Sequence, residues 1–534
     1  MEPQQNNVII SLNPSTEEEV GRVAAQPKDE IDKVIGKARA AFPNWAARPI
    51  KERQAFLSRL SQVILDEKEN VARLIASEQG KPVAEAMASE VVAVLAILKD
   101  LSRHAHKILK IEKVNHQQLL FAHKKSKYLL EPYGVVAVIS PWNYAFSVPI
   151  PEIAAALVAG NTVVFKPAPD TVLIGQKIAE LFEQAGFPAG VMNALFVADT
   201  DAPHITHHPG IDKIVFTGST PVGRDVMCAA SNQMTPVILE LGGKDPAIVA
   251  ADADIPRAAR GIVWGALFNA GQVCASVERV YVEKPVAEPF IQLCLEEMRS
   301  LTVGDPLESS TQVGPLTNHE QLIKVQDHIQ EAARQGAKLL CGGSRLDRPG
   351  YFLQPTLLTN VNHTMRVMTE ETFGPVLPVM VVDSLDDAIT LANDSIYGLS
   401  AYAWTGSRDT AERLMRELQA GTVMINDSTS SWGEPLAPWG GFKKSGIGRT
   451  RARIGLMEMV QVKFASYDRG GNARNVWWYP YTAQMQAFMF RAAELLYSKN
   501  LITKLKNLLP VLLNRRFFSS AHWGALIKHI RKLF

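Results

Sequence analysis

Apolar residues recur along this chain at two different spacings, and the spacing changes near residue 128. Over residues 29–42 the apolar side chains lie three or four positions apart, which indicates one face of a helix. They are Ile31, Val34, Ile35, Ala38, Ala41 and Phe42. Similar spacing predicts further helical structure over residues 51–79 and 84–109. The first part of the chain is therefore predicted to be mainly helical.

After residue 128, short apolar runs alternate with segments of helical spacing. The runs are GVVAVIS, NTVVFKP, MNALFV and KIVFTGS, followed by PAIVAA, RVYVE, KLLCGG, LPVMVV, AYAWTG and TVMIND. Apolar strands separated by helices indicate βαβ units and parallel sheets covered on both faces. The pattern predicts two α/β domains whose ligands bind beyond the carboxyl ends of the strands.

Length and composition narrow the class of protein. A chain of 534 residues exceeds what one hydrophobic core supports, so several domains are expected. A net charge of +2 gives no reason to expect a nucleic-acid partner. The N-terminus has no signal-peptide pattern, and no apolar run of about eighteen residues would span a bilayer.

The four cysteines show no CxxC pair and no histidine at metal-ligand spacing. They are Cys228, Cys274, Cys294 and Cys341. This usage argues against a disulfide framework or a zinc site, and it fits a reducing cytoplasm.

Candidate chemistry gathers where predicted strands end. Trp142 and Asn143 end one strand in ISPWNYAF, and Lys166 ends another in FKPAPD. Gly218, Ser219 and Gly223 follow a strand in FTGSTPVG, and Glu240 stands before a glycine pair in LELGGKDP. FTGSTPVG lacks the GK[ST] of a P-loop, so it fits either a phosphate-binding helix start or an ordinary turn.

Cys274 lies among small residues in FNAGQVCAS, which would give a substrate room to reach the thiol. A thiolate nucleophile acting on a carbonyl needs an oxyanion partner and a base to activate water. Asn143 and Glu240 are the residue types for those two tasks. The alternative is a buried structural cysteine and a solvated or paired glutamate. Residue types alone leave both interpretations open.

Seven motifs in register favour the first interpretation. PWN, KPA, FTGSxxxG, LELGGKDP, FNAGQxC, EETFGPV and WGGFKKSGIGR follow one another over roughly residues 8–468. In this order and spacing the chain resembles an NAD(P)-dependent aldehyde dehydrogenase. The resemblance implies an α/β fold with a Rossmann-type cofactor domain, an α/β catalytic domain and a small β oligomerisation element, in a homodimer or homotetramer. The expected boundaries are 1–115 with 133–241, 242–445, and 116–132 with 446–468, followed by a tail at 469–534.

The resemblance also implies catalytic roles. Cys274 matches the nucleophile that forms a thiohemiacetal and then a thioester, and Asn143 matches the side chain of the oxyanion hole. Glu240 matches the base for hydrolysis. Its presence disfavours transfer of the acyl group to coenzyme A, and the three residues together disfavour a non-catalytic nucleotide-binding scaffold.

For NAD or NADP the resemblance assigns Lys166 to the adenine-side ribose and Glu371 with Phe373 to the nicotinamide side. Gly218, Ser219 and Gly223 match the loop under the pyrophosphate, and the same site is expected to include Ser140, Trp142, Ala168 and Leu241. Pro169 stands where many NAD-preferring members carry a glutamate, so we expect tolerance of NADP, with Asp170 as the neighbouring acid that could restore discrimination.

Tyr144 and Trp439 match the entry tunnel of the family, and Val273 and Ala275 flank the nucleophile. None of them is charged, so an apolar aldehyde, aliphatic or aromatic, is expected. Ala145 replaces a common proline and is expected to change only the stiffness of its loop.

The tail has a different composition. Residues 491–534 contain nine Lys or Arg and one acidic residue. Leu501, Leu505, Leu508 and Leu512 form one helical stripe, which Pro510 is expected to kink or divide. Trp523, Leu526, Ile527, Ile530 and Phe534 form a second stripe. Basic amphipathic helices bind anionic membrane surfaces, which would make the enzyme peripheral, but packing on protein is the open alternative.

Overall fold

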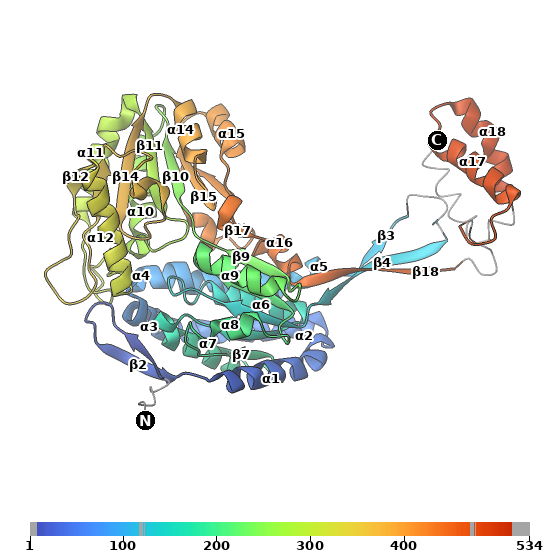
Figure 1. The fold of residues 1–534 in the computed structure, drawn as a ribbon, viewed down its shortest axis with the longest axis horizontal. Coiled ribbons are helices and arrows are strands. Elements are labelled where there is room, and N and C mark those ends of the chain that lie inside the picture. The colour runs from blue at the N-terminus through green and yellow to red at the C-terminus, as the bar shows by residue number, and fades with distance from the viewer. Residues whose placement is uncertain (1–7, 117–120, 122, 470–474, 476, 515–534) are drawn as a thin grey trace. The chain divides into compact units, whose positions relative to one another are not determined.

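A computed structural model describes residues 8–116, 121, 123–469, 475 and 477–514 of the chain (Figure 1). Two compact units emerge from it. The first unit contains residues 1–108 and 132–460, and the second contains residues 109–131 and 461–534. Residues 446–460, expected in the oligomerisation element, thus belong to the first unit.

The N-terminal part of the first unit is mainly helical, as the spacing predicts. Strand β1 (Val8–Leu12) pairs antiparallel with β2 (Glu19–Ala24). The helices that follow are α1 (Lys28–Ala46), α2 (Ile50–Asp66), α3 (Lys68–Gln79), α4 (Val83–Glu85) and α5 (Ala93–Ile108). Between α4 and α5 the chain makes a π-helical turn at Ala86–Val92, which spacing alone does not reveal.

A six-stranded sheet forms one half of the first unit. Its order is β17-β9-β8-β5-β6-β7, and all neighbours are parallel except β17 with β9. The strands are β5 (Val135–Ile139), β6 (Thr162–Lys166), β7 (Met192–Ala194), β8 (Lys213–Thr217), β9 (Val237–Glu240) and β17 (Gly446–Ile447). The helices between them are α6 (Pro149–Ala159), α7 (Val172–Gln184), α8 (Ala202–Thr206) and α9 (Thr220–Ser231).

The order of this sheet reverses at β5. The chain leaves β5 toward β6 and β7, and then returns to place β8 on the other side of β5. In doubly wound sheets a crevice opens beyond the strand ends at such a point, and ligands bind there. The segments that end β5 and β8 are those that carry Ser140 to Asn143 and Gly218 to Ser219.

A seven-stranded sheet forms the other half of the first unit, in the order β12-β13-β14-β11-β10-β15-β16. Its strands are β10 (Asp245–Val249), β11 (Val277–Glu283), β12 (Lys338–Cys341), β13 (Thr356–Thr359), β14 (Val376–Val382), β15 (Ser400–Trp404) and β16 (Thr422–Ile425). The pairing is parallel except at the edge, where β12 runs antiparallel to β13. The apolar runs predict a parallel sheet, so the antiparallel edge strand differs from the expectation, and β13 was not predicted.

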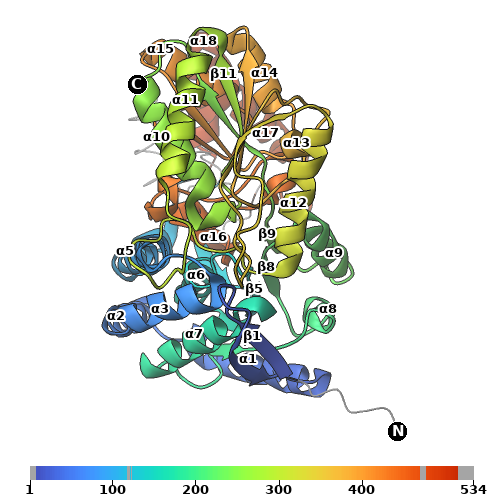
Figure 2. The same ribbon diagram turned by 90° about the vertical axis from the view of Figure 1, so that its left-hand side faces the viewer.

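Helices cover both faces of this sheet (Figure 2). They are α10 (Ile255–Leu267), α11 (Lys284–Ser300), α12 (His319–Arg334), α13 (Arg366–Thr369), α14 (Leu385–Asn393) and α15 (Arg408–Glu417). Side chains of β11 alternate between two cores: Val280 packs with residues of α10 and α11, and Tyr281 packs with residues of α12 and α14. A last short helix, α16 (Ala452–Met457), packs against α5 and α6.

The second unit contains a three-stranded sheet in the order β18-β4-β3, formed by β3 (Glu112–Val114), β4 (Lys124–Pro132) and β18 (Val460–Asp468). It also contains a helical hairpin, α17 (Ala483–Tyr497) and α18 (Leu501–Leu512). Met485, Phe488, Ala492 and Val511 form the small core of the hairpin. No helix among the described residues is long and apolar enough to cross a membrane.

Of the two outcomes expected at Pro510, a kink or a division, division is wrong, since α18 continues to Leu512 with the proline inside it. Proline removes the N–H that would bond to the carbonyl four residues earlier, and the packing of Val511 in the core of the hairpin accompanies the continued last turn. The second predicted stripe, Trp523 to Phe534, lies outside the described residues.

Candidate active site

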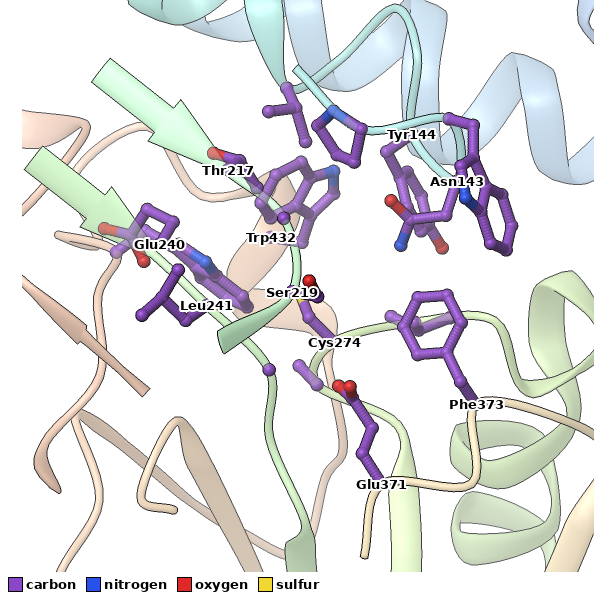
Figure 3. A pocket seen from close by; sticks show the side chains of 18 of the residues that line it. Asn143, Tyr144, Thr217, Ser219, Glu240, Leu241, Cys274, Glu371, Phe373 and Trp432 are labelled. Atoms are coloured by element: carbon purple, nitrogen blue, oxygen red, sulfur yellow. The ribbon is translucent and has the colours of Figure 1, made fainter. Parts of the chain in front are cut away.

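One cavity of about 230 Å³ in the first unit brings most of the candidate residues together. Figure 3 shows Cys274 near its centre, with Glu240 on one side and Glu371 and Phe373 on the other. The predicted residues that line it are Trp142, Asn143, Tyr144, Gly218, Ser219, Glu240, Leu241, Val273, Cys274, Ala275, Glu371, Phe373 and Trp439. Ser140, Lys166, Ala168 and Gly223 are not among its lining residues.

The loop that carries Cys274 is fixed by unusual backbone geometry. A 3-10 turn at Phe268–Gly271 contains Asn269 and Ala270, both at φ 53°, before Gly271 at φ 73°. A Cβ on Gly271 would collide with the carbonyl oxygen of Gly374, so only glycine fits there. Three consecutive residues in the left-handed region turn the chain sharply and direct Cys274 into the cavity, just before β11 begins.

The electrostatics of the site favour the thiol form of Cys274. Burial raises the pKa of its thiol well above the ordinary value, and the nearby carboxylates of Asp245, Glu371 and Glu240 raise it further. Cys274 is a free cysteine. Reaction as a nucleophile therefore requires a nearby base or cation to stabilise the thiolate.

Asn143 is held so that its amide faces the nucleophile loop. Its Nδ2 donates to the carbonyl oxygen of Gln272 at 3.0 Å, two residues before Cys274. The backbone carbonyl oxygen of Asn143 accepts hydrogen bonds from Lys81 Nζ at 3.1 Å and from Asn269 Nδ2 at 3.2 Å. A preorganised amide donor at this place suits an oxyanion.

A buried ion pair supports the Asn143 loop. Lys81 Nζ lies 2.5 Å from Glu90 Oε1, and both side chains are fully buried. Glu90 lies in the π-helical turn, and its Oε2 accepts the backbone N–H groups of Phe146 and Ser147 at 2.9 and 3.0 Å. This pair links the segment after α3 and the π-helical turn to the loop after β5, and the sequence analysis did not predict it.

Glu240 ends β9 as a buried carboxyl group. Neither of its oxygens has a hydrogen-bond partner among the described residues. Burial raises its pKa well above the ordinary value, the charge of Glu152 raises it further, and Arg449 and Arg451 act in the opposite direction. A dehydrated and unpaired carboxyl is a stronger base than one in water, which suits proton abstraction.

Glu371 and Phe373 form the opposite end of the cavity. Glu371 Oε1 accepts the backbone N–H of Gly243 at 3.0 Å, and burial is the main cause that raises its pKa to about 7. Phe373 has φ 59°, and its ring meets that of Trp142 edge-on at 5.5 Å. Glu278 fixes this loop, because its carboxylate accepts the N–H groups of Thr372 and Phe373 at 2.8 and 2.7 Å.

The start of α9 forms a cradle of backbone groups. Ser219 is the N-cap residue, its side chain makes no capping bond, and Gly218 N donates to Glu240 O at 3.0 Å. Gly223 lies in the first turn, where a Cβ would collide with Leu241. The nearby Ser140 Oγ is buried without a partner among the described residues. An anionic pyrophosphate fits such a helix start, so the donor set fits a dinucleotide.

Lys166 ends β6 with its side chain almost completely buried, and its Nζ lies 2.5 Å from Asp199 Oδ1. Asp199 follows β7, and its side chain is 75% exposed. Asp170, the acid that the sequence suggested, instead accepts a hydrogen bond from Asn318 Nδ2 at 3.0 Å. Ala168 is buried in extended backbone before the 3-10 turn Pro169–Thr171. The acid at Lys166 is therefore Asp199, which the sequence analysis missed.

The remaining wall is apolar and aromatic. Tyr144 lies 5.7 Å from the ring of Trp432, which in turn meets Trp439 edge-on at 4.9 Å. These rings form one buried cluster with Val148, Phe268, Val273, Ala275 and Leu399, and Cys274 packs against it. Phe268 and Trp432 were not predicted, although both are aromatic residues close in sequence to predicted site residues.

Comparison with known proteins finds relatives along most of the chain. The profile described as the Aldehyde dehydrogenase family matches residues 1–465. A probable succinate-semialdehyde dehydrogenase [NADP(+)] of Sinorhizobium fredii is 37% identical over 458 residues, which cover 85% of this chain and 91% of that protein. A 4,4'-diapolycopene aldehyde oxidase of Methylomonas sp is 37% identical over 477 residues, 89% of this chain and 88% of that protein. The NAD+ complex of an aldehyde dehydrogenase from Bacillus cereus superposes with a TM-score of 0.83 at 33% identity, and the match covers 86% of this chain and 93% of that one.

Proposed function

The chain belongs to the aldehyde dehydrogenase family, and from this we propose that it oxidises an apolar aldehyde to the carboxylic acid through covalent intermediates on Cys274. Members of this family are NAD(P)-dependent oxidoreductases that act on aldehydes. The observation that carries the proposal is the single cavity in which Cys274 lies between Glu240 and the pair Glu371 and Phe373.

Three residues of the cavity have defined tasks in this reaction. The Cys274 thiol gives its proton to Glu240, which releases it to bulk water, and Sγ bonds to the carbonyl carbon. The carbonyl oxygen takes the charge, stabilised by Asn143 Nδ2 and the backbone N–H of Cys274. Loss of hydride from that carbon leaves a thioester. Glu240 then takes a proton from water, the hydroxide oxygen bonds to the acyl carbon, and the C–S bond breaks to release the acid.

The residues present fit a nicotinamide dinucleotide. The bare start of α9 and the unpaired Ser140 Oγ would hold its phosphates and sugar, and Lys166 would reach the adenine-side ribose. Glu371 and Phe373 would hold the nicotinamide end. The cofactor supplies the hydride acceptor, and the chain orients it and excludes water.

An apolar substrate is supported by the wall opposite the cofactor end. Tyr144, Trp432, Trp439 and Phe268 present rings, and Val273 with Ala275 flanks the thiol. Among the described residues that line the cavity, the charged ones are Glu240, Lys324 and Glu371. Glu371 and Lys324 interact electrostatically with each other at the cofactor end. Two cations lie against the aromatic wall, Arg451 over the Trp432 ring and Lys81 over the Tyr144 ring. Arg451 donates to backbone carbonyl oxygens and Lys81 pairs with Glu90, so both are already engaged by the protein and the wall offers a substrate mainly rings.

The test is nicotinamide reduction by the full-length protein with short, long and aromatic aldehydes, with NAD and NADP in parallel. We expect kcat/KM to rise with apolar size. In Glu240→Gln we expect one equivalent of reduced cofactor per site followed by turnover slower by about 10²–10⁴-fold, because the thioester accumulates. Cys274→Ala should reduce none.

Other outcomes would assign the protein differently. Turnover that requires added coenzyme A would make it an acylating dehydrogenase. Absence of reduction with every aldehyde, together with a Cys274→Ala protein that keeps its biological effect, would make it a nucleotide-binding scaffold.

We also propose that the second unit binds an anionic membrane surface. The hairpin buries only one set of apolar side chains, and large apolar residues remain exposed on its outer surface: Phe490, Tyr497, Leu501, Ile502, Leu505, Leu509 and Leu513. Basic residues Lys499, Lys504 and Lys506 lie in the same segment. Apolar contact plus positive charge is the combination that anionic lipid recognises.

Sedimentation with vesicles tests this surface. Full-length protein should sediment with vesicles that contain phosphatidylserine, and Ile502→Ser/Leu509→Ser should remain in solution. Val222→Ser, which replaces an exposed apolar residue in the first unit, is the control. Equal sedimentation of the double variant would contradict the proposal and leave packing on protein as the explanation.

For the assembly we propose a homodimer or homotetramer. Among the described residues, β18 and β3 are the edge strands of the three-stranded sheet, and each has a strand neighbour on one side only. An edge strand can pair with a strand of a second copy. Light scattering of the purified protein gives the mass directly, and a monomer of 58.7 kDa would contradict this proposal.

A further inference from the structure

A second buried carboxyl group lies behind Glu240 and has no task in the reaction described so far. Glu152 is the one charged residue of α6, a helix whose eleven residues are all buried. Its Oε1 accepts a hydrogen bond from Thr217 Oγ1 at 3.3 Å, and its Oε2 has no partner among the described residues. Burial of a polar atom without a partner is costly, so the position requires an explanation.

Glu152 and Glu240 line the same small cavity. This cavity has a volume of about 20 Å³, and its polar lining also includes Thr217, Thr450, Arg451 and Cys274. A space of this size holds about one water molecule, and a buried water needs two to four polar partners. The unpaired oxygens of the two carboxyl groups are suitable partners for a water there.

Two arginines and one thiol are the other ionisable groups close to the pair. Arg451 donates to the carbonyl oxygens of Trp432 and Ser147, and its guanidinium lies 3.4 Å from the centre of the Trp432 ring. Arg449 donates to backbone carbonyl oxygens of Gly441 and Gly448. Both arginines favour ionised Glu240, Arg451 also favours ionised Glu152, and the Cys274 thiol lines the same cavity.

We propose that Glu152 and Glu240 form a carboxyl pair that shares one proton across the water-sized cavity, so that either carboxyl can hold the proton and Glu240 acts as base when the proton is on Glu152. This proposal rests on the function proposed above. When Glu240 takes a proton from the hydrolytic water, the pair holds two protons, and one is lost to bulk water before the next turnover. Glu152 is thus a positioning residue that sets the pH range in which Glu240 is charged.

The electrostatics agree with the geometry. Burial raises the pKa of both carboxyl groups, that of Glu152 to about 8 and that of Glu240 well above its ordinary value, so the pair retains a proton near pH 7. If Glu152 were ionised, its charge would raise the pKa of Glu240 further. Two carboxylates that share one site titrate as a coupled pair, because like charges cannot both be present at low cost.

Infrared difference spectroscopy of the protonated carboxyl band tests the pair without any aldehyde. The full-length protein should show two coupled ionisations, and Glu152→Gln should lower the ionisation of Glu240 by about one pH unit. Glu240→Gln should lower that of Glu152 by a similar amount. Glu78→Gln is the matched control, since Glu78 is a buried carboxyl whose pKa burial raises to about 7 and which lines neither cavity.

The same variants give a kinetic readout. The pH profile of thioester hydrolysis should show two ionisations in the wild type and in Glu78→Gln, and one ionisation at lower pH in Glu152→Gln. Unchanged titration of Glu240 in Glu152→Gln would overturn the pair. If the wild type oxidised no aldehyde, the proposed function would fail, yet the infrared titration would still decide whether the two groups share a proton.

Discussion

The ion pair between Lys166 and Asp199 makes a specific prediction about the cofactor. Pro169 removes the acid that many NAD-preferring relatives place near the ribose, but Asp199 brings a carboxylate to 2.5 Å from Lys166 Nζ. This carboxylate would repel a ribose phosphate and occupy the lysine that would bind it. Asp199→Asn should therefore raise the efficiency with NADP relative to NAD.

The exposure of the pair sets the size of the effect. Asp199 is 75% exposed, so water and salt screen its charge strongly. Two unit charges about 4 Å apart interact with an energy of about 1 kcal/mol in water. The measured contribution of an exposed ion pair to stability is about 0.2–1 kcal/mol. An effect of about 1 kcal/mol corresponds to a change of about five-fold in the ratio of kcat/KM for the two cofactors.

The assay compares kcat/KM for NADP and NAD with one aldehyde, and dissociation constants from quenching of tryptophan fluorescence give a readout separate from turnover. Asp201→Asn is the matched control, because Asp201 lies two residues away and pairs with Lys28 at 3.7 Å. A ratio that stays constant in Asp199→Asn, or that shifts equally in Asp201→Asn, would refute this reasoning.

Three further variants test other parts of the first unit. Asn143→Ala removes the side-chain oxyanion donor and should lower kcat by about 10²–10³-fold, measured in steady state, with an unchanged melting temperature. Lys81→Met leaves Glu90 charged and buried, so urea unfolding should show a loss of about 3–5 kcal/mol, and the double variant Lys81→Met/Glu90→Gln should recover part of it. Gly242→Ala places a Cβ 2.7 Å from Glu371 Oε2, which must then move away from Gly243 N, and fluorescence titration should show weaker cofactor binding with little change in stability.

Local patterns in the sequence were enough to predict the strands that carry the site. Three of these strands are short apolar runs: β5 ends before Ser140, β6 ends at Lys166, and β8 ends before Gly218. In each case the change from apolar to polar or glycine residues marks the end of the strand in the sequence. Seven motifs in register gave the family, and the cavity brings Cys274, Glu240, Asn143, Glu371 and Phe373 together.

The contacts that the sequence did not reveal join residues distant along the chain. Asp199 lies 33 positions after Lys166, and Glu152 meets Thr217 across 65 positions. Periodicity carries no information about such pairs, because it reports neighbours within one helix or strand and these partners lie on different elements. The continuation of α18 past Pro510 was missed for a different reason: proline only disfavours helix, and the sequence does not show that the neighbouring Val511 packs in the core of the hairpin.

The π-helical turn at Ala86–Val92 contains one residue more per turn than an α-helix would. Removing a single residue from it would restore regular α-helix and rotate everything on one side of the deletion by about 100° relative to the other side. Glu90 would then no longer face both Lys81 and the backbone of Phe146 and Ser147. The orientation of the loop that bears Asn143 therefore depends on the number of residues in this turn as well as on their identity. The segment should tolerate substitutions at its surface positions better than any change of length.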